Sequence, residues 1–195
     1  MHAGHRPDSR DERAVRPANG TRALALLAIL TAAGSCASAT ADEAVRPGRS
    51  VTLHGQALSV HLAAGTTHPT GPLLVYATGD GGWPGDEALF DRMRPWGYPM
   101  AGFSSADYVG QIDGPGHVIE PGPLAADMGA ILDDAIRGLG LARGTPVVLV
   151  GFSRGSGLSI AAATDARLRA RLRGILAVAL TGEEEYVAER AVGAA

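Results

Sequence analysis

The chain has 195 residues, of which 46% are hydrophobic and 19% are charged, and its formal net charge at pH 7 is −3. This length and composition fit one globular domain, and the slightly acidic balance gives no reason to expect nucleic-acid binding. Cys36 is the single cysteine of the sequence, so no disulfide can form within the chain.

The N-terminal part has the layout of a bacterial export signal. An apolar run at residues 23–33 follows several arginines and precedes small residues, and it is too short to cross a bilayer as a helix. Cleavage after the Ala-Ser-Ala at residues 37–39 would give a soluble periplasmic or secreted protein. Residues 33–36 also resemble a lipobox, which would place a lipid anchor on Cys36. Both alternatives imply export from the cytoplasm.

We assign residues 1–49 to the signal peptide and a linker, and residues 50–195 to an α/β domain. Short apolar runs there alternate with segments of helical periodicity. The expected strands are 51–53 and 58–62, which form a hairpin, and then 73–77, 99–103, 146–150 and 175–180. The expected helices are 84–96, 123–139 and the segment after residue 155. This order predicts a doubly wound, mostly parallel sheet that binds ligands at the carboxyl ends of its strands.

Side-chain positions on the expected helices follow from their periodicity. Trp96 continues the apolar face of the first helix, so we expect it in the core. Asp127, Asp133 and Asp134 lie off the apolar face of the second helix, so we expect them to be solvated.

A glycine-rich segment at residues 79–83, with the sequence GDGGW, follows a buried-type strand. In α/β-hydrolases the loop at this place supplies one backbone N–H group to the oxyanion hole. We therefore expect oxyanion donors at Gly81 and Gly82, and we expect Asp80 and Trp83 to line a substrate pocket. The alternative is an ordinary strand–helix turn with an aspartate as helix cap.

Residues 151–155 (GFSRG) match the G-x-S-x-G pattern of a nucleophile elbow, between a valine-rich strand and a helix. The pattern predicts Ser153 as the nucleophile, in a tight turn near a helix N-terminus, where N–H groups favour negative charge. The backbone of Arg154 would supply the second oxyanion donor. A dinucleotide-binding loop is a rival interpretation, but it requires a Tyr-x-x-x-Lys motif, and the sequence contains no lysine.

Residues 74–83 and 148–155 together resemble the VirJ/AcvB-type bacterial virulence family of α/β-hydrolases, over about residues 70 to 182. The resemblance implies periplasmic export, a link to virulence-related secretion, and hydrolysis of aminoacylated phosphatidylglycerol, which is an ester. It implies Ser153 as the nucleophile. No cofactor and no metal are expected.

The sequence departs from the α/β-hydrolase pattern after the elbow. The superfamily orders its triad as Ser, acid and then His, but no histidine follows Ser153 in this sequence. His117 lies on a loop at the correct end of the sheet, and Glu183 follows the next strand, so these two are the candidate base and acid. A serine hydroxyl without a base is a poor nucleophile.

We therefore expect a serine hydrolase whose α/β-hydrolase domain is incomplete at its C-terminal end and has little or no activity as it stands. A non-catalytic periplasmic binding or interaction module is the alternative. The expected substrate is a small-molecule or lipid ester. The basic stretch at residues 165–173 would contact a membrane surface, or else it is a solvated helix end. The apolar strand at 175–180 would be open to a partner chain or a second copy.

Overall fold

The structure is a computed structural model that describes residues 46–113 and 119–180. The signal and lipobox, His117 and Glu183 all lie outside the described residues. Within the described residues, no helix combines the length and the apolar character needed to cross a membrane.

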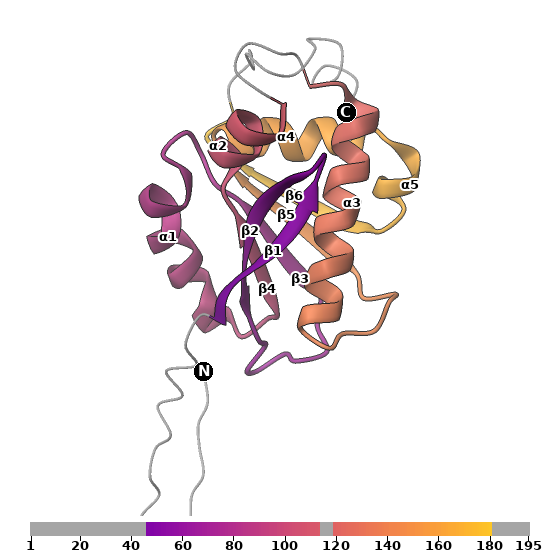
Figure 1. The fold of residues 1–195 in the computed structure, drawn as a ribbon. Helices are drawn as coiled ribbons and strands as arrows, with labels where there is room; N and C mark the ends of the chain where they lie inside the picture. Colours follow the sequence, from indigo (N-terminus) through magenta and orange to yellow (C-terminus); the bar gives the residue numbers. More distant parts are fainter. Residues whose placement is uncertain (1–45, 114–118, 181–195) are drawn as a thin grey trace, which may run out of the picture. The chain divides into compact units, whose positions relative to one another are not determined.

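Six strands form one sheet in the order β1-β2-β4-β3-β5-β6 (Figure 1). Strands β3, β4, β5 and β6 pair in parallel, and the hairpin of β1 and β2 adds to β4 in the antiparallel direction. The strands are β1 (Arg46–Leu53), β2 (Gln56–Ala63), β3 (Leu73–Ala77), β4 (Met100–Phe103), β5 (Val147–Phe152) and β6 (Leu172–Val178). The predicted mostly parallel α/β sheet is confirmed. Because β1 begins at Arg46, the sheet includes residues that the sequence assigned to the linker.

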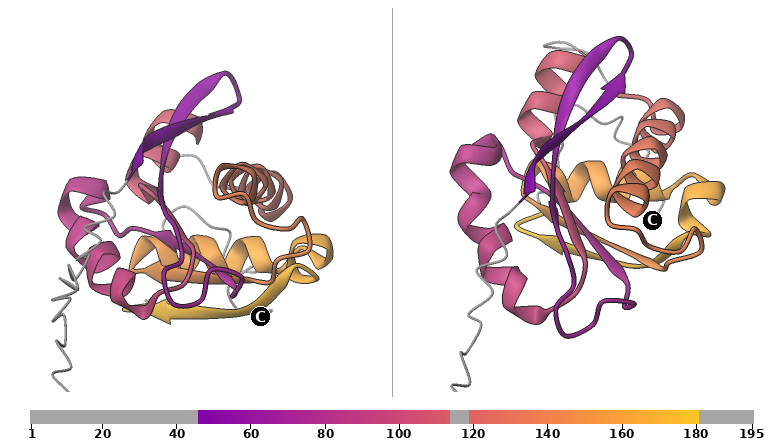
Figure 2. Two further views of the ribbon diagram at one scale, coloured as in Figure 1. Left: turned by 90° about the horizontal axis from the view of Figure 1, so that it is seen from below. Right: turned by 60° about the horizontal axis from the view of Figure 1, so that its bottom comes forward.

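Helices cover both faces of this sheet. They are α1 (Gly82–Met93), η1 (Arg94–Trp96), α2 (Ser105–Asp107), η2 (Tyr108–Asp113), α3 (Pro121–Gly138), α4 (Arg154–Ala163) and α5 (Ala166–Arg169). Figure 2 shows α1 on one side of the sheet and α3 and α4 on the other. The central strands are therefore buried on both faces, as their continuous apolar sequences predicted.

Alternate residues of the central strands enter two separate cores. In β3, Leu73 and Val75 pack with the side chains of α3 and α4, whereas Leu74 and Tyr76 pack with Phe90 of α1. This is the period of two that an extended strand imposes on its side chains. Because β4, β3 and β5 are parallel neighbours, they end at the same edge of the sheet, and the loops that follow them lie side by side.

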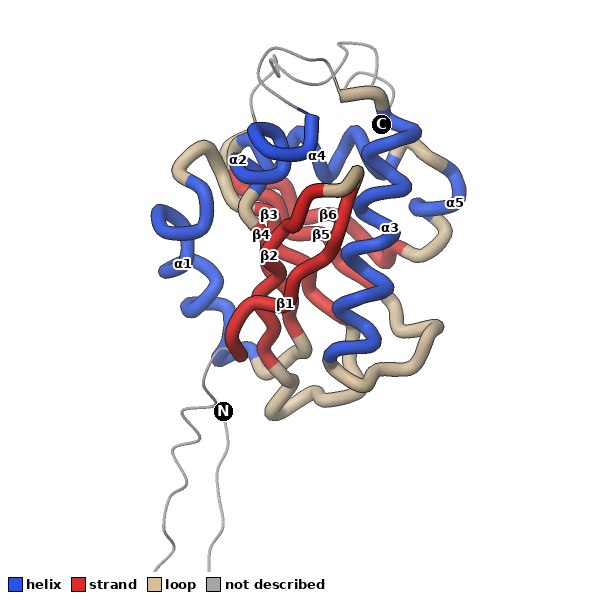
Figure 3. The backbone as a smooth tube through the Cα atoms, viewed as in Figure 1, coloured by secondary structure: helices blue, strands red, loops and turns tan. Residues whose placement is uncertain are grey.

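The acidic face of α3 is partly buried, which corrects the expectation that all three aspartates are solvated. Asp127 and Asp134 are buried, and only Asp133 is exposed. The reason is that the β1–β2 hairpin lies alongside α3 (Figure 3) and covers this face, as the bond between Arg49 and Asp134 shows. The sequence contains no local signal for this packing.

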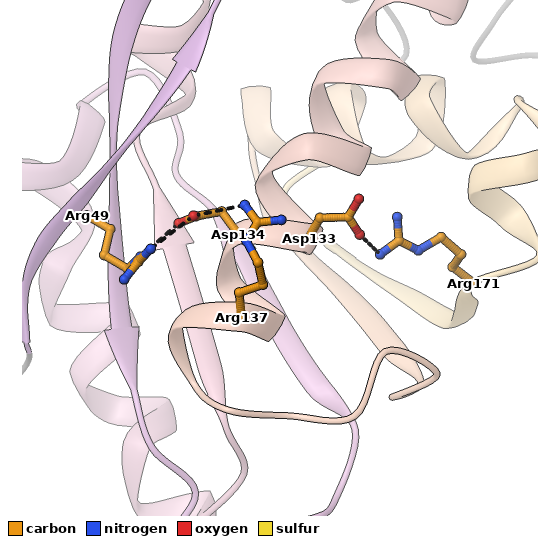
Figure 4. A network of polar contacts seen from close by, with 5 residues as sticks. All are labelled: Arg49, Asp133, Asp134, Arg137 and Arg171. Carbon is orange, nitrogen blue, oxygen red and sulfur yellow. Dashed lines mark hydrogen bonds and ion pairs between the residues drawn. The ribbon is translucent and has the colours of Figure 1, made fainter.

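Ion pairs join α3 to both of its neighbours (Figure 4). Asp134 accepts hydrogen bonds from Arg49 Nε at 3.0 Å and from Arg137 Nη2 at 3.2 Å, while Asp133 accepts one from Arg171 at 2.6 Å. The bond from Arg49 holds the pKa of Asp134 below its ordinary value, although burial acts in the opposite direction. This network fixes α3 between the hairpin and the start of β6.

One apolar expectation is wrong. Trp96 is 48% exposed, because α1 ends at Met93 and the following 3-10 turn points this ring away from the core. Strand β6 lies at the edge of the described sheet and is exposed along most of its length, as the sequence predicted for an apolar edge strand. The basic stretch before it contains only one short helix, α5, and then enters β6 at Leu172.

Candidate active site

Ser153 adopts the strained backbone geometry of a tight strand-to-helix turn. Its φ is 49° and its ψ is −117°, between the end of β5 and the start of α4. Such a conformation is costly for a residue with a side chain and persists only where the surroundings enforce it. Here the N–H of Ser153 donates to the carbonyl of Val178 at 2.8 Å, and its own carbonyl accepts the N–H of Ser156 at 2.8 Å. Strand β6 and helix α4 thus hold the turn from both sides.

The two glycines of the G-x-S-x-G pattern are needed for close packing. A Cβ atom on Gly151 would collide with the backbone of Gly155, and a Cβ on Gly155 would collide with the carbonyl of Ala77 in β3. Both glycines therefore let α4 begin in direct contact with β5 and β3. This explains in physical terms the spacing that the sequence shows around Ser153.

The glycine-rich loop after β3 lies against Ser153. Strands β3 and β5 are neighbours, and Ala77 pairs with Gly151 at their carboxyl ends. A Cβ atom on Gly79 would lie 3.3 Å from the Cβ of Ser153, so the loop backbone passes directly beside the serine side chain. The structure thus brings together the two segments that the sequence analysis singled out.

Hydrogen bonds give the loop a defined shape. The N–H of Gly79 donates to Asp86 Oδ2 at 2.6 Å, and the Oγ of Ser105 donates to the Gly79 carbonyl at 3.2 Å. The same carbonyl accepts the N–H of Gly82 at 3.2 Å, so this expected oxyanion donor is already bonded within the loop. Within the described part of the chain, the N–H groups of Asp80 and Gly81 have no such acceptor. These two N–H groups are therefore available to an acceptor outside the loop.

Asp80 and Trp83, the two expected pocket residues, have different surroundings. Asp80 forms an ion pair with Arg154, in which its Oδ1 lies 2.8 Å from the Nε atom of Arg154. Trp83 is only 8% exposed, and its ring stacks on His61 with 3.7 Å between the ring centroids. The ring fits there because Gly102 has no side chain, since an added Cβ would collide with it. Trp83 is thus a core residue between α1 and the sheet, because α1 starts one residue before it and turns it inward.

A histidine–aspartate pair that the sequence did not indicate lies at the tip of the β1–β2 hairpin. His54 Nε2 is 2.9 Å from Oδ2 of the buried Asp127, which also accepts a hydrogen bond from the hydroxyl of Tyr108 at 2.8 Å. His54 lies in the hairpin turn, beyond the residues of β2 that pair with β4, which are Val60–Ala63. Its partner in the structure is Asp127 of α3.

The other described histidines have aromatic partners. His61 stacks on Trp83, and burial lowers its pKa while the nearby Glu87 opposes this shift. His68, in the loop after β2, stacks on Tyr98. Within residues 46–113 and 119–180, no cluster of three His, Cys, Asp or Glu side chains could hold a metal ion.

His117 lies outside the described residues, in the sequence between η2, which ends at Asp113, and α3, which begins at Pro121. Strands β4 and β5 both end at the carboxyl edge of the sheet, where Ser153 lies. Glu183 follows β6, which ends at Val178 beside the elbow.

Comparison with known proteins shows the fold. No protein-family model matches the chain, and no curated protein matches it. Among solved structures, a protein assigned as a dienelactone hydrolase from Klebsiella pneumoniae is similar, with a TM-score of 0.51, 15% identity, and coverage of 70% of this chain and 60% of that one. A thermostable carboxyl esterase from Bacillus coagulans is similar with a TM-score of 0.51, 13% identity, and coverage of 67% and 43%.

The chain thus spans about half the length of the solved structures that it resembles. Both are hydrolases by description, and at this level of identity the likeness concerns the arrangement of strands and helices. Together with the sheet order and the turn at Ser153, it shows that the described residues have the α/β-hydrolase fold.

Proposed function

We propose that the protein is an exported serine hydrolase that cleaves an ester through Ser153. The observation that carries this proposal is the strained turn at Ser153, with φ of 49° and ψ of −117°, next to a loop that offers backbone donors. Strain of this kind is retained where it positions a reacting group. The named structural neighbours, a dienelactone hydrolase and a carboxyl esterase, are consistent with ester chemistry.

In the proposed reaction the Oγ of Ser153 attacks the ester carbonyl carbon, and negative charge develops on the carbonyl oxygen. The backbone N–H of Arg154, at the start of α4, and the N–H groups of Asp80 and Gly81 are the proposed donors to that oxygen. One such donor typically contributes roughly 3 kcal/mol to transition-state stabilisation. The alcohol then leaves with a proton, and water hydrolyses the acyl-serine to release the acid and restore the hydroxyl.

The proposed base is His117, and the proposed acid is Glu183. The support for His117 is its position in the sequence, between η2 and α3, in the segment that follows the carboxyl end of β4. General-base catalysis typically contributes 10²- to 10⁴-fold to a rate, as an order-of-magnitude range. We therefore expect the rate of ester cleavage to depend strongly on His117.

The finer proposal is membership of the VirJ/AcvB-type virulence family, with a periplasmic lipid ester such as aminoacylated phosphatidylglycerol as substrate. It is supported by the GDGGW loop beside the elbow and by the signal layout of residues 23–39. Cell fractionation and mass measurement of the mature N-terminus test the export. Cleavage after Ala39 and a lipid on Cys36 give different masses, and an uncleaved cytoplasmic chain contradicts both.

A fluorophosphonate probe tests the catalytic proposal directly. We expect the full-length protein to be labelled on Ser153, and we expect Ser153→Ala to abolish labelling, because the probe reacts with an activated serine. Ser59→Ala, an exposed serine on β2, is the matched control and should label like the parent. His117→Ala should slow labelling by about 10²-fold or more. Labelling that is absent from the parent, or unchanged in Ser153→Ala, overturns the proposal.

The alternative function, a binding or interaction module, is favoured by one observation. Strand β6 exposes Ile175, Leu176 and Val178 at the edge of the described sheet, and such an edge is a template for pairing with another chain. An unlabelled protein that sediments as a dimer, and as a monomer after Leu176→Arg, would favour this function over hydrolysis.

A further inference from the structure

We propose that the ion pair between Arg154 and Asp80 is a clasp that sets the distance between the two sides of the oxyanion site. The proposal rests on the hydrolase function proposed above and adds positioning residues to that site. Neither side chain is required to touch the substrate. Each belongs to a residue whose backbone N–H is a proposed donor.

The clasp connects two segments that are far apart in the sequence. Arg154 directly follows Ser153 and is the first residue of α4, and Asp80 is in the loop after β3. The β3–β5 ladder ends at the pair Ala77–Gly151, before either residue. The ion pair, with 2.8 Å between Arg154 Nε and Asp80 Oδ1, links the loop after β3 to the start of α4, beyond the last paired residues of the two strands.

Other hydrogen bonds of the loop lead away from the elbow. Asp86, in α1, accepts a hydrogen bond from the N–H of Gly79, and Ser105, in α2, donates one to the Gly79 carbonyl. These bonds fix the shape of the loop relative to α1 and α2, but they do not set its distance from α4. The side chain of Arg154 reaches across to the loop and is only 18% exposed, whereas Asp80 is 64% exposed.

The expected effect is on rate and not on overall stability. A partly exposed ion pair contributes little to folding. A displacement of about 1 Å in a reacting group can nevertheless cost about 10²-fold in rate. Loss of the clasp should therefore lower the turnover of bound substrate while leaving substrate affinity and folding nearly unchanged.

A double-mutant cycle tests the clasp in the full-length protein. We expect Asp80→Asn and Arg154→Gln each to slow fluorophosphonate labelling of Ser153 by about 10- to 100-fold. The double variant should be no slower than the worse single variant, because both changes break the same contact. With a p-nitrophenyl ester, kcat should fall while KM stays within about twofold of the parent.

The ion pair between Arg171 and Asp133 supplies the matched control, since its 2.6 Å distance and side-chain exposures of 31% and 57% are similar. Asp133→Asn should label at the parental rate. Parental rates in both clasp variants, or additive losses in the double variant, overturn the proposal.

Amide hydrogen exchange supplies a readout that does not depend on activity. We expect faster exchange in peptides covering residues 78–83 and 153–157 in Asp80→Asn, and not in Asp133→Asn, because the loop and elbow would separate more often. Arg154→Lys, which keeps the positive charge, should retain more protection from exchange than Arg154→Gln. Unchanged exchange in Asp80→Asn refutes the clasp even if Ser153 is unreactive. If exchange is faster in Asp80→Asn but the parent protein is not labelled by the probe, the clasp is supported and only the hydrolase proposal is overturned.

Discussion

Strands β5 and β6 are adjacent, parallel and similarly apolar, yet they have opposite surroundings. Leu149 and Ile175 face each other in register, with exposures of 0% and 36%, and the next pair, Val150 and Leu176, has 4% and 46%. Strand β5 has a neighbour on each side and helices on both faces, whereas β6 is the edge of the described sheet. Burial of a strand is thus a property of its neighbours and not of its own sequence.

The exposed strand nevertheless supports the buried one at the candidate site. The carbonyl of Val178 at the end of β6 accepts the N–H of Ser153 and the hydroxyl of Ser156. The backbone of β6 therefore matters to the elbow, although its side chains contribute little apolar burial. Substitutions can separate these two roles.

The largest expected effect comes from Gly155→Ala at the start of α4. The added Cβ would collide with the carbonyl of Ala77, which is backbone and cannot move aside without shifting β3. Overpacking of this kind typically costs about 1–3 kcal/mol and occasionally more. Because the added Cβ meets backbone here, we expect a loss that exceeds the cost of a single truncation in the core. Gly174→Ala on β6, where an added Cβ meets nothing within 4 Å, is the control. Urea denaturation that shows equal stability for both variants would contradict the difference between the two strands.

A matched pair of truncations tests the difference in burial between β5 and β6, with a smaller expected loss of stability. Leu149→Ala should lower the free energy of unfolding by about 2–5 kcal/mol, because it opens a cavity in the core. Ile175→Ala, one strand away in the same register, should lower it by about 1 kcal/mol or less, because the side chain is already partly hydrated. Denaturation midpoints report both values. A cost for Ile175→Ala as large as for Leu149→Ala would show that something covers β6 in solution.

The smallest expected effect is a pH dependence on the α1 side of the sheet, away from both β5 and β6. Burial lowers the pKa of His61 from its ordinary value of 6.5. Between the lowered folded-state pKa and 6.5 the unfolded chain binds more protons, so the stability that neutral His61 supports is present above pH 6.5 and falls as the pH drops. His61→Phe keeps an aromatic stack on Trp83 and should reduce this loss. Denaturation at pH 5 and at pH 7.5 measures it, and an equal loss in the variant would exclude His61 as the cause.

Much of the architecture was predictable from local patterns. The apolar runs at β3 and β5, the spacing of the glycines around Ser153, and the hairpin at the start of the domain were all correctly placed. They depend on periodicity and on steric limits within a few residues, and these act in the same way in any fold. The meeting of the loop at 79–83 with Ser153 followed from the rule that parallel strands end at the same edge.

The tertiary structure alone decided which polar and aromatic side chains meet. The burial of Asp127 and Asp134, the stacking of Trp83 on His61, and the ion pair of Arg154 with Asp80 all join segments that are distant in the sequence. Local pattern determines what a segment can form, whereas burial and pairing depend on which other segment packs against it. That choice is made by the whole chain when its two cores close around the sheet.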